Sequence, residues 1–187
     1  MDRDRLKEIM FDQKDVFNRG KQLITRDLEL DRYTSTKQVV VISGIRRCGK
    51  SSLLNLIKEE MNLSEEEYCY FNFDDERILT DVSILESIYN LHIEIYGREP
   101  ILFLDEIQNI ENWEKFVNRI YERGIKVFIT GSNASLLSSE IATSLTGRNK
   151  QIELFPFSFA EFLRFNGKSY NLDRLSSRSK SFLIQDF

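Results

Sequence analysis

Short apolar runs alternate along this chain with longer segments in which apolar residues recur every three or four positions. The clearest run is the apolar tetrapeptide 39–42, inside a strand that we predict over 38–43. A strand that is apolar at successive positions is typical of a sheet covered on both faces. The same pattern predicts four more strands, over 68–73, 101–104, 126–130 and 150–154.

Amphipathic helices are predicted between these strands from apolar stripes, capping residues and glycine stops. Two weaker helical patterns, over 2–11 and 15–30, precede the first strand. Five helical patterns are stronger. The first three cover about 50–61, a segment that is capped by Thr80 or Ser83 and ends at Gly97, and a segment from Trp113 to Gly124. The fourth contains Leu137, Ile141 and Leu145, and the fifth begins at a capping box of Ser158 and Glu161 and ends at about Phe165.

Strands that alternate with helices predict an α/β fold, with a mostly parallel five-stranded sheet between two helical layers. We divide the chain into an N-terminal helical segment (1–34), a core (35–166) and an irregular tail (167–187). Open parallel sheets bind ligands beyond the carboxyl ends of their strands. The residues that follow each strand are therefore the candidate site.

The first strand is followed by G-I-R-R-C-G-K-S, a complete G-x-x-x-x-G-K-[ST] phosphate loop. Gly44 and Gly49 permit backbone angles that turn successive N–H groups toward one anion. The next helix directs its positive N-terminal end at the same point. Lys50 supplies a charge to the β- and γ-phosphates, and the Ser51 hydroxyl is a magnesium ligand. The expected nucleotide-binding residues are Gly44, Arg46, Arg47, Cys48, Gly49, Lys50, Ser51 and Ser52.

The side chains inside the loop allow more than one interpretation. Arg46 and Arg47 can face phosphate or can hold the acidic segment 74–76, and the sequence does not decide between these. Cys48 is interpreted as a small packing residue, because no nearby histidine would make it a nucleophile. His92 lies in a predicted helix and is interpreted as a structural or surface residue.

The third strand ends in two acids, Asp105 and Glu106. The first fits a Walker B aspartate, which holds Mg²⁺ directly or through water. A second carboxylate beside the γ-phosphate can orient and polarise an attacking water. The pair therefore favours water as the acceptor of the phosphoryl group, and hence hydrolysis.

Two further candidates follow later strands and helices. Asn133, with Ser132 as second choice, lies after the fourth strand, where a polar side chain would reach the γ-phosphate or the water. Arg148 follows Gly147 at a predicted helix end. It can stabilise transition-state charge in a neighbouring subunit's site, or it can complement its own helix dipole.

Composition and charge narrow the function classes. The chain has 187 residues, 41% of them hydrophobic, and a net charge of -4, which argues against general nucleic-acid binding. Its single His and two Cys do not make the usual zinc sets, and no apolar run is long enough to span a membrane. A reducing cytoplasm is the expected location.

Other nucleotide-binding classes fit less well. A dinucleotide-binding G-x-G-x-x-G would need glycine where Arg46 stands. A guanine-reading N-K-x-D has its nearest match at 149–152, where Ile152 takes the place of the acid. A small-molecule kinase would need a catalytic lid with clustered arginines, and none is clear.

Several ordered motifs resemble those of prokaryotic AAA+-type ATPases with an R-R-x-G-K-[ST] loop. The motifs are V-V-V-I-S-G-I-R-R-C-G-K-S at 39–51, F-L-D-E-I-Q-N at 103–109, T-G-S at 130–132, L-T-G-R at 145–148 and L-F-P-F-S-F-A-E-F at 154–162. The resemblance implies a strand order of 5-1-4-3-2, ATP as nucleotide and Mg²⁺ as cofactor. It also implies Ser132 or Asn133 as a sensor of the γ-phosphate and Arg148 as a candidate finger.

Members of this family continue into a C-terminal domain of unknown function, so the resemblance implies that the chain is truncated and that its tail begins the missing domain. The predicted function is Mg²⁺-dependent ATP hydrolysis coupled to a conformational task. The alternative is a nucleotide-dependent switch with negligible turnover. The predicted partners are ATP, a further copy of the chain through Arg148, and an unknown protein, without direct membrane or nucleic-acid contact.

Overall fold

The fold comes from a computed structural model, which describes residues 2–19, 23–78, 81–132 and 145–167. Its strands are β1 (Val39–Ser43), β2 (Tyr68–Asn72), β3 (Ile101–Asp105), β4 (Val127–Gly131) and β5 (Asn149–Glu153). Its helices are α1 (Arg3–Asn18), α2 (Asp31–Thr34), α3 (Lys50–Glu60), α4 (Ser83–Tyr96), α5 (Trp113–Glu122) and α7 (Phe159–Phe165), with a 3-10 turn at Ile107–Asn109.

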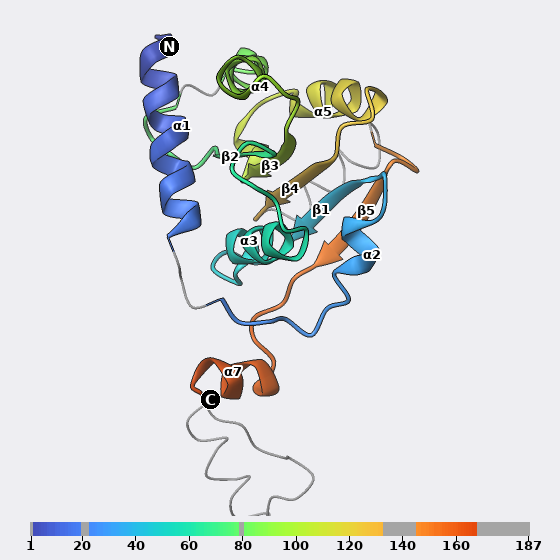
Figure 1. The fold of residues 1–187 in the computed structure, drawn as a ribbon. Helices are drawn as coiled ribbons and strands as arrows, with labels where there is room; N and C mark the ends of the chain where they lie inside the picture. Colours follow the sequence, from blue (N-terminus) through green and yellow to red (C-terminus); the bar gives the residue numbers. More distant parts are fainter. Residues whose placement is uncertain (1, 20–22, 79–80, 133–144, 168–187) are drawn as a thin grey trace, which may run out of the picture.

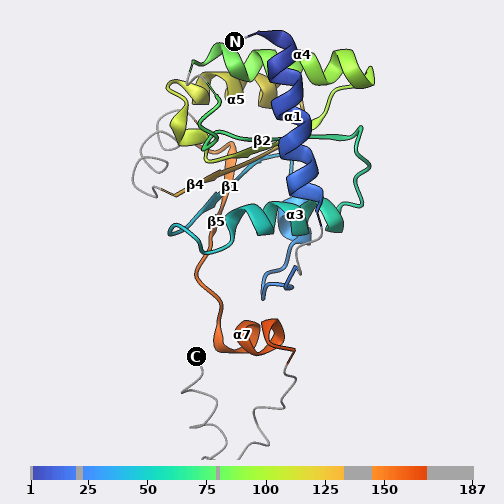
Figure 2. The same ribbon diagram turned by 90° about the vertical axis from the view of Figure 1, so that its left-hand side faces the viewer.

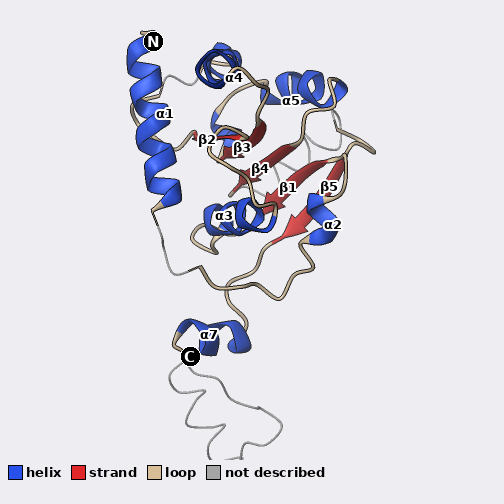
Figure 3. Cartoon of the chain, in the orientation of Figure 1, coloured by secondary structure: helices blue, strands red, loops and turns tan. Residues whose placement is uncertain are grey.

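The strands form one parallel sheet in the order β2-β3-β4-β1-β5 (Figures 1 and 3). This confirms the expected α/β fold and the order 5-1-4-3-2, counted from the other edge. Ser43 is in register with Gly131, and Asn72 is in register with Asp105. The strands therefore end at a common edge, where the phosphate loop and the two acids both lie.

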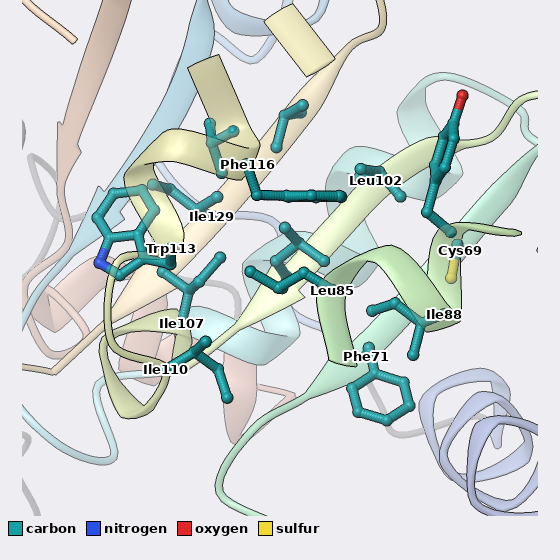
Figure 4. Close-up of a cluster of buried hydrophobic side chains, with 14 of the residues drawn as sticks. Cys69, Phe71, Leu85, Ile88, Leu102, Ile107, Ile110, Trp113, Phe116 and Ile129 are labelled. Atoms are coloured by element: carbon teal, nitrogen blue, oxygen red, sulfur yellow. The ribbon is translucent and has the colours of Figure 1, made fainter. Parts of the chain in front are cut away.

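Helices cover both faces of the sheet, as the apolar strands require. Helices α4 and α5 lie on one face and α3 lies on the other (Figure 1). On the α4/α5 face, Figure 4 shows Phe71, Leu102 and Ile129 of the strands near Leu85 and Phe116 of the helices, and all five are buried. The strands are thus held rigidly beneath the loops that carry the candidate site.

Helix α1 covers the β2 edge of the sheet and crosses from the α4 side to the α3 side (Figure 2). Ile9 and Met10 belong to the core under α4, whereas Phe17 belongs to the core under α3. The Phe17 ring stacks on Tyr70 of β2, with 3.9 Å between ring centroids. The helix therefore protects an edge strand that would otherwise be open to pairing.

The predicted N-terminal helices, 2–11 and 15–30, were wrong in their extent. One helix, Arg3–Asn18, runs through the predicted break, and residues 23–30 are not helical. Gln13 and Lys14, two polar residues in the predicted gap, belong to this helix, and both are buried. Their polar ends are satisfied by hydrogen bonds, from Gln13 to the end of β2 and from Lys14 to the loop before it.

The ends of other helices test the capping predictions. The capping box of Ser158 and Glu161 is present, and Gly97 ends α4 with a φ of 69°. Ser83 is the first residue of α4 and not its cap; instead, its N–H donates to Asp81 Oδ1 at 2.7 Å. Three predicted features lie outside the described residues. They are Thr80, the part of the helix expected around Leu137 and Ile141 as far as residue 144, and the tail from residue 168.

Among the described residues, no helix is both long and apolar enough to cross a membrane. The division of the chain at residues 34 and 166 stays a prediction.

Candidate functional site

Two glycines shape the phosphate loop between β1 and α3. A Cβ on Gly44 would lie 2.3 Å from the carbonyl oxygen of Leu154, so the close passage of the chain beyond β5 excludes any side chain there. Gly49 has a φ of 98°, in the left-handed region that glycine adopts without strain, and it is the N-cap of α3. These two positions let the loop turn tightly before the helix begins.

Lys50 lies inside the loop and is only 4% exposed. Its Nζ donates to the carbonyl oxygens of Gly44 and Ile45, at 3.3 Å each. The same atom lies 3.3 Å from Glu106 Oε1. The ammonium group is thus placed between the loop backbone and the second acid of β3, although the two segments are far apart in sequence.

Asp105 ends β3 and is fully buried. The Thr130 hydroxyl donates to its Oδ1, and the Tyr70 hydroxyl donates to its Oδ2 at 3.0 Å. Burial and the neighbouring Asp105 charge raise the pKa of Tyr70, so the phenol keeps its proton and remains a donor. Side chains of β2 and β4 therefore fix the orientation of the Asp105 carboxylate.

Glu106 leaves the strand with a left-handed backbone, at a φ of 53°. Its N–H donates to Thr130 Oγ1 at 2.9 Å, so one hydroxyl binds both acids. Its Oε2 accepts hydrogen bonds from Gln108 Nε2 at 2.7 Å and from the Ser132 N–H at 3.1 Å. The strained turn directs the carboxylate toward Lys50 and away from the core.

The pKa of Glu106 is lowered from its ordinary value. Burial alone would raise it, but the hydrogen bonds from Gln108 and Ser132 and the Lys50 charge together outweigh that effect. The carboxylate is therefore ionised at neutral pH.

The donor set at this edge suits a hard cation such as Mg²⁺. Asp105 offers carboxylate oxygens, each of which accepts one hydrogen bond and has a second lone-pair direction left. Ser51 is exposed in the first turn of α3. Within the described residues no group of three or more His, Cys, Asp or Glu forms a metal cluster. Proteins usually hold Mg²⁺ by one or two carboxylates together with water and substrate phosphates.

Of the two contacts that the sequence leaves open for Arg46, the structure shows the one with the acidic segment. Arg46 Nη2 lies 3.2 Å from Asp74 Oδ2, in an exposed ion pair with the acidic segment 74–76. Arg47 is exposed with a φ of 67°, and its side chain has no hydrogen bond or ion pair to another described residue. Cys48 is buried in the core under α3, and burial raises the pKa of its thiol. Both observations agree with packing rather than nucleophilic chemistry at Cys48.

Arg148 lies just before β5, at the amino ends of the strands, whereas the phosphate loop lies at their carboxyl ends. Its carbonyl accepts the N–H of Val39, at the beginning of β1, at 2.9 Å. Its guanidinium bonds to Asn118 Oδ1 at 3.1 Å and to Glu122 Oε1 at 3.0 Å, both on α5. The structure therefore keeps Arg148 away from the phosphate loop of its own chain. Asn133 lies outside the described residues.

An apolar cavity of about 390 Å³ adjoins the phosphate loop on the α3 side. Leu23 and Ile24 of the N-terminal segment line one part of it. Ser52 of α3 and Phe157, which follows β5, line other parts. The cavity was not expected from the sequence, because its walls come from three segments whose proximity depends on the fold.

Four polar residues around the site were also missed: Tyr70, Thr130, Gln108 and Arg26. Thr130 stood in the T-G-S motif, but only the residues after it were considered. Tyr70 of β2 contacts Asp105 of the neighbouring strand, and Gln108 contacts Glu106 within the turn that follows β3. Arg26, in a stretch predicted as helix, is buried next to the loop.

The parallel sheet, the phosphate loop after β1 and the paired acids at the end of β3 define a nucleotide-binding module of the P-loop ATPase class. The chain matches the family described as AAA domain over residues 36–163. That match covers more than half of the chain, so the protein belongs to this AAA+-type family.

Two curated relatives extend beyond the matched region. An uncharacterized protein of Methanocaldococcus jannaschii, MJ1544, is 37% identical over 181 residues, which cover 95% of this chain and 39% of that protein. An uncharacterized protein of Haemophilus influenzae is 32% identical over 175 residues, covering 87% of this chain and 44% of its own length. The chain thus spans about two-fifths of the length of these relatives.

Among solved structures, the chain resembles the Thermotoga maritima RuvB Holliday junction branch migration motor. The TM-score is 0.51 and the sequence identity is 20%, over 79% of this chain and 52% of RuvB. At this level of identity the likeness concerns the fold alone.

Proposed function

We propose that this protein binds ATP with Mg²⁺ and hydrolyses it to ADP and phosphate. The observation that carries the proposal is the 3.3 Å approach of Lys50 Nζ to Glu106 Oε1 at the mouth of a complete phosphate loop. This approach supports the proposal because it brings together the cation proposed to bind phosphate and the carboxylate proposed to act on the attacking water. Family membership supports the proposal.

Binding uses three parts of the site. Backbone N–H groups of the loop and the N-terminus of α3 receive the phosphates, and Lys50 exchanges its carbonyl partners for phosphate oxygens. Ser51 and Asp105 would hold Mg²⁺, which neutralises charge on the phosphates when bound. The apolar cavity beside Ser52, with a volume of about 390 Å³, is the proposed site of the purine base, which would lie near Leu23 and Phe157.

Hydrolysis needs one water and one base. The water oxygen forms a bond to the γ-phosphorus, while the bond from that phosphorus to the β–γ bridging oxygen breaks and leaves ADP. Glu106 orients the water and accepts its proton. Gln108 and the Ser132 N–H hold the carboxylate by Oε2, which leaves Oε1 facing Lys50 and the phosphates. Asn133 is the proposed second contact to the water or the γ-phosphate.

A second candidate is a nucleotide-dependent switch with negligible turnover. One observation favours it: the Glu106 carboxylate is held by Lys50, Gln108 and Ser132 together, and its pKa is lowered, which makes it a weaker base. If nucleotide binding does not release Glu106 from Lys50, the site would bind ATP without cleaving it.

The whole protein's partners are also proposals. Arg148 is the proposed contact through which a further copy of the chain completes the site, and an unknown protein partner would receive the conformational work. The cytoplasm is the proposed location, since Cys48 and Cys69 are both free thiols, as a reducing compartment keeps them.

Phosphate release under saturating ATP and Mg²⁺ separates the two candidates. Glu106→Gln should keep ATP binding and lose at least about 100-fold of the rate, because an amide preserves the shape but not the basicity of the carboxylate. Glu111→Gln, at an exposed position five residues away, is the matched control and should hydrolyse normally. If Glu106→Gln and the unaltered protein release phosphate equally fast, Glu106 is not the base. If neither hydrolyses bound ATP, the switch is correct.

A further inference from the structure

One buried arginine, Arg26, connects the segment after β5 with the phosphate loop. Arg26 Nε lies 2.8 Å from Glu161 Oε1 of α7. Its Nη1 donates to the Cys48 carbonyl oxygen of the phosphate loop at 3.2 Å, and its Nη2 donates to the Phe155 carbonyl oxygen at 2.7 Å. Three segments that are far apart in sequence therefore meet on a single guanidinium group.

This contact is closed to solvent and fully satisfied. The Arg26 and Glu161 side chains are 7% and 5% exposed. Glu161 Oε1 also accepts the Asp27 N–H at 2.9 Å, and Oε2 accepts the Ser158 N–H at 2.7 Å as part of the capping box. A buried ion pair is costly to break when one partner moves alone. Arg26, the loop carbonyl and α7 are thus expected to move together.

The same residues border the apolar cavity. Arg26 and Gly49 line it from the side of the loop, and Phe157 and Phe165 line it from the side of α7. The Arg26 guanidinium also lies over the Phe157 ring, 5.0 Å from its centroid. A ligand that enters the cavity and the loop would therefore meet Arg26 on one side and the aromatic residues Phe157 and Phe165 on the other.

We propose that Arg26 is a positioning residue that couples nucleotide binding at the phosphate loop to the position of α7 through Glu161. The proposal rests on the proposed function, because the coupled ligand is the nucleotide. The Cys48 carbonyl precedes Gly49, so its direction sets the direction of the Gly49 N–H that faces phosphate. A shift of this peptide on binding pulls on Arg26, and Arg26 carries the shift to Glu161 and Phe155.

The coupling is reciprocal by thermodynamic necessity. If binding stabilises one position of α7, then a fixed α7 position strengthens binding by the same factor. The L-F-P-F-S-F-A-E segment would then be the route by which the nucleotide state reaches the part of the chain beyond α7.

A second ion pair joins the same two segments and supplies a control. Arg164 Nη2 of α7 lies 2.7 Å from Asp27 Oδ1, but this pair is exposed and does not touch the loop. Loss of the Arg164 side chain removes a link between the N-terminal segment and α7 and leaves the link through the Cys48 carbonyl in place.

Hydrogen exchange of the chain with and without a non-hydrolysable ATP analogue plus Mg²⁺ tests the proposal. In the unaltered protein, exchange should slow both in the loop 44–52 and in α7 when the analogue binds. Arg26→Gln at saturating analogue should keep the slowing in the loop and lose it in α7. The affinity for the analogue should fall by about 5- to 150-fold, the usual range of such coupling. Glu161→Gln should likewise lose the slowing in α7 and bind the analogue more weakly. Arg164→Ala should keep both the slowing in α7 and the affinity of the unaltered protein.

The outcomes are distinguishable even if Arg26→Gln folds poorly, because the unaltered protein alone decides part of the question. Slower exchange in the loop with no change in α7 would overturn the coupling and leave ATP binding intact. No change in either place would contradict ATP binding itself and the coupling with it. Equal loss of the α7 response in Arg164→Ala and Arg26→Gln would assign the effect to general docking of α7 and overturn the role of Arg26.

Discussion

At the scale of single residues, Thr130 is the least expected member of the site. Its hydroxyl donates to Asp105 Oδ1 and accepts from the Glu106 N–H, so one buried oxygen joins both acids to β4. Thr130→Val keeps the shape and removes both bonds. An unsatisfied buried acceptor costs about 1–3 kcal/mol, so urea unfolding should show a loss of stability of that size. Thr130→Ser keeps the hydroxyl and is the matched control.

The same substitution should also slow hydrolysis, since Glu106 would lose the hydrogen bond that fixes its left-handed turn. A Thr130→Val protein that is as stable and as active as Thr130→Ser would show that the hydroxyl network has no role in the site.

Sequence reasoning at this scale worked best where a motif fixes the backbone. The phosphate loop and the two acids could be located because their chemistry depends on local spacing after a strand. Tyr70 and Thr130 could not, because their contacts with Asp105 depend on which strands are neighbours. The sequence offers only a weak signal, namely a polar residue at or near the end of an apolar strand. The functional roles of the motif residues stay predictions.

At the scale of elements, α4 carries the only histidine of the chain, and the structure makes it a buried one. His92 Nε2 lies 3.0 Å from the Glu66 carbonyl oxygen, and its ring is 4.7 Å from that of Tyr96. Burial, opposed by the bond to Glu66 and helped by the charges of Lys14 and Arg98, lowers the pKa of His92 to about 4. The imidazole is therefore neutral in the folded chain at neutral pH.

The lowered pKa makes stability depend on pH. Between about pH 6.5 and 4 the unfolded chain binds a proton at this site that the folded chain does not, so stability falls as pH falls. Folding should lose about 2 kcal/mol between pH 7 and 5 from this group alone, at about 1.4 kcal/mol per unit of pKa difference. Urea unfolding at a series of pH values measures the slope.

His92→Gln, which can still bond to the Glu66 carbonyl, is the control and should flatten that slope. An equal slope in both proteins would show that His92 titrates normally. Because the chain has one histidine, a proton NMR titration of its imidazole gives the folded pKa directly.

Strands β1 to β4 could be predicted within one or two residues because each contains a run of apolar residues, whereas β5 has Ile152 as its one apolar residue. The extent of helix α1 could not be predicted in this way, because Gln13 and Lys14 are polar but buried. Their hydrogen bonds go to the end of β2 and to the loop before it, and the periodicity of the helix alone does not reveal these contacts. Residues 23–30 were predicted as helix from a weak apolar pattern. In the structure Arg26 is instead used to contact the phosphate loop and α7.

At the scale of the whole molecule, the two ends of the sheet have different roles. The phosphate loop lies at the carboxyl ends of the strands, and Arg148 lies at the amino end of β5, where it pairs with Asn118 and Glu122 of α5. An arginine at that edge can reach a phosphate only in another copy of the chain. An arginine finger can contribute about 10³–10⁵ in rate.

We therefore expect the isolated chain to be mostly monomeric and to turn over slowly, with a specific activity that rises with protein concentration. Arg148→Ala should abolish the rise and keep ATP binding. Arg123→Ala is the matched control, since Arg123 is an exposed arginine near the same end of α5 and pairs with Glu99. A specific activity that is flat with concentration, together with a lower melting temperature of Arg148→Ala, would make Arg148 a structural partner of α5 only.

The central claim is that this edge of the sheet binds ATP through Lys50, and titration calorimetry with ATP and Mg²⁺ tests it most directly. Lys50→Ala removes a buried charge that is proposed to contact phosphate, and such a contact is worth about 1.5–3 kcal/mol, so the affinity should fall at least about 10-fold. Lys37→Ala removes the same charge from an exposed position ahead of β1 and should bind as the unaltered protein does. Equal ATP affinity for Lys50→Ala and Lys37→Ala, or no binding by the unaltered chain, would contradict the account.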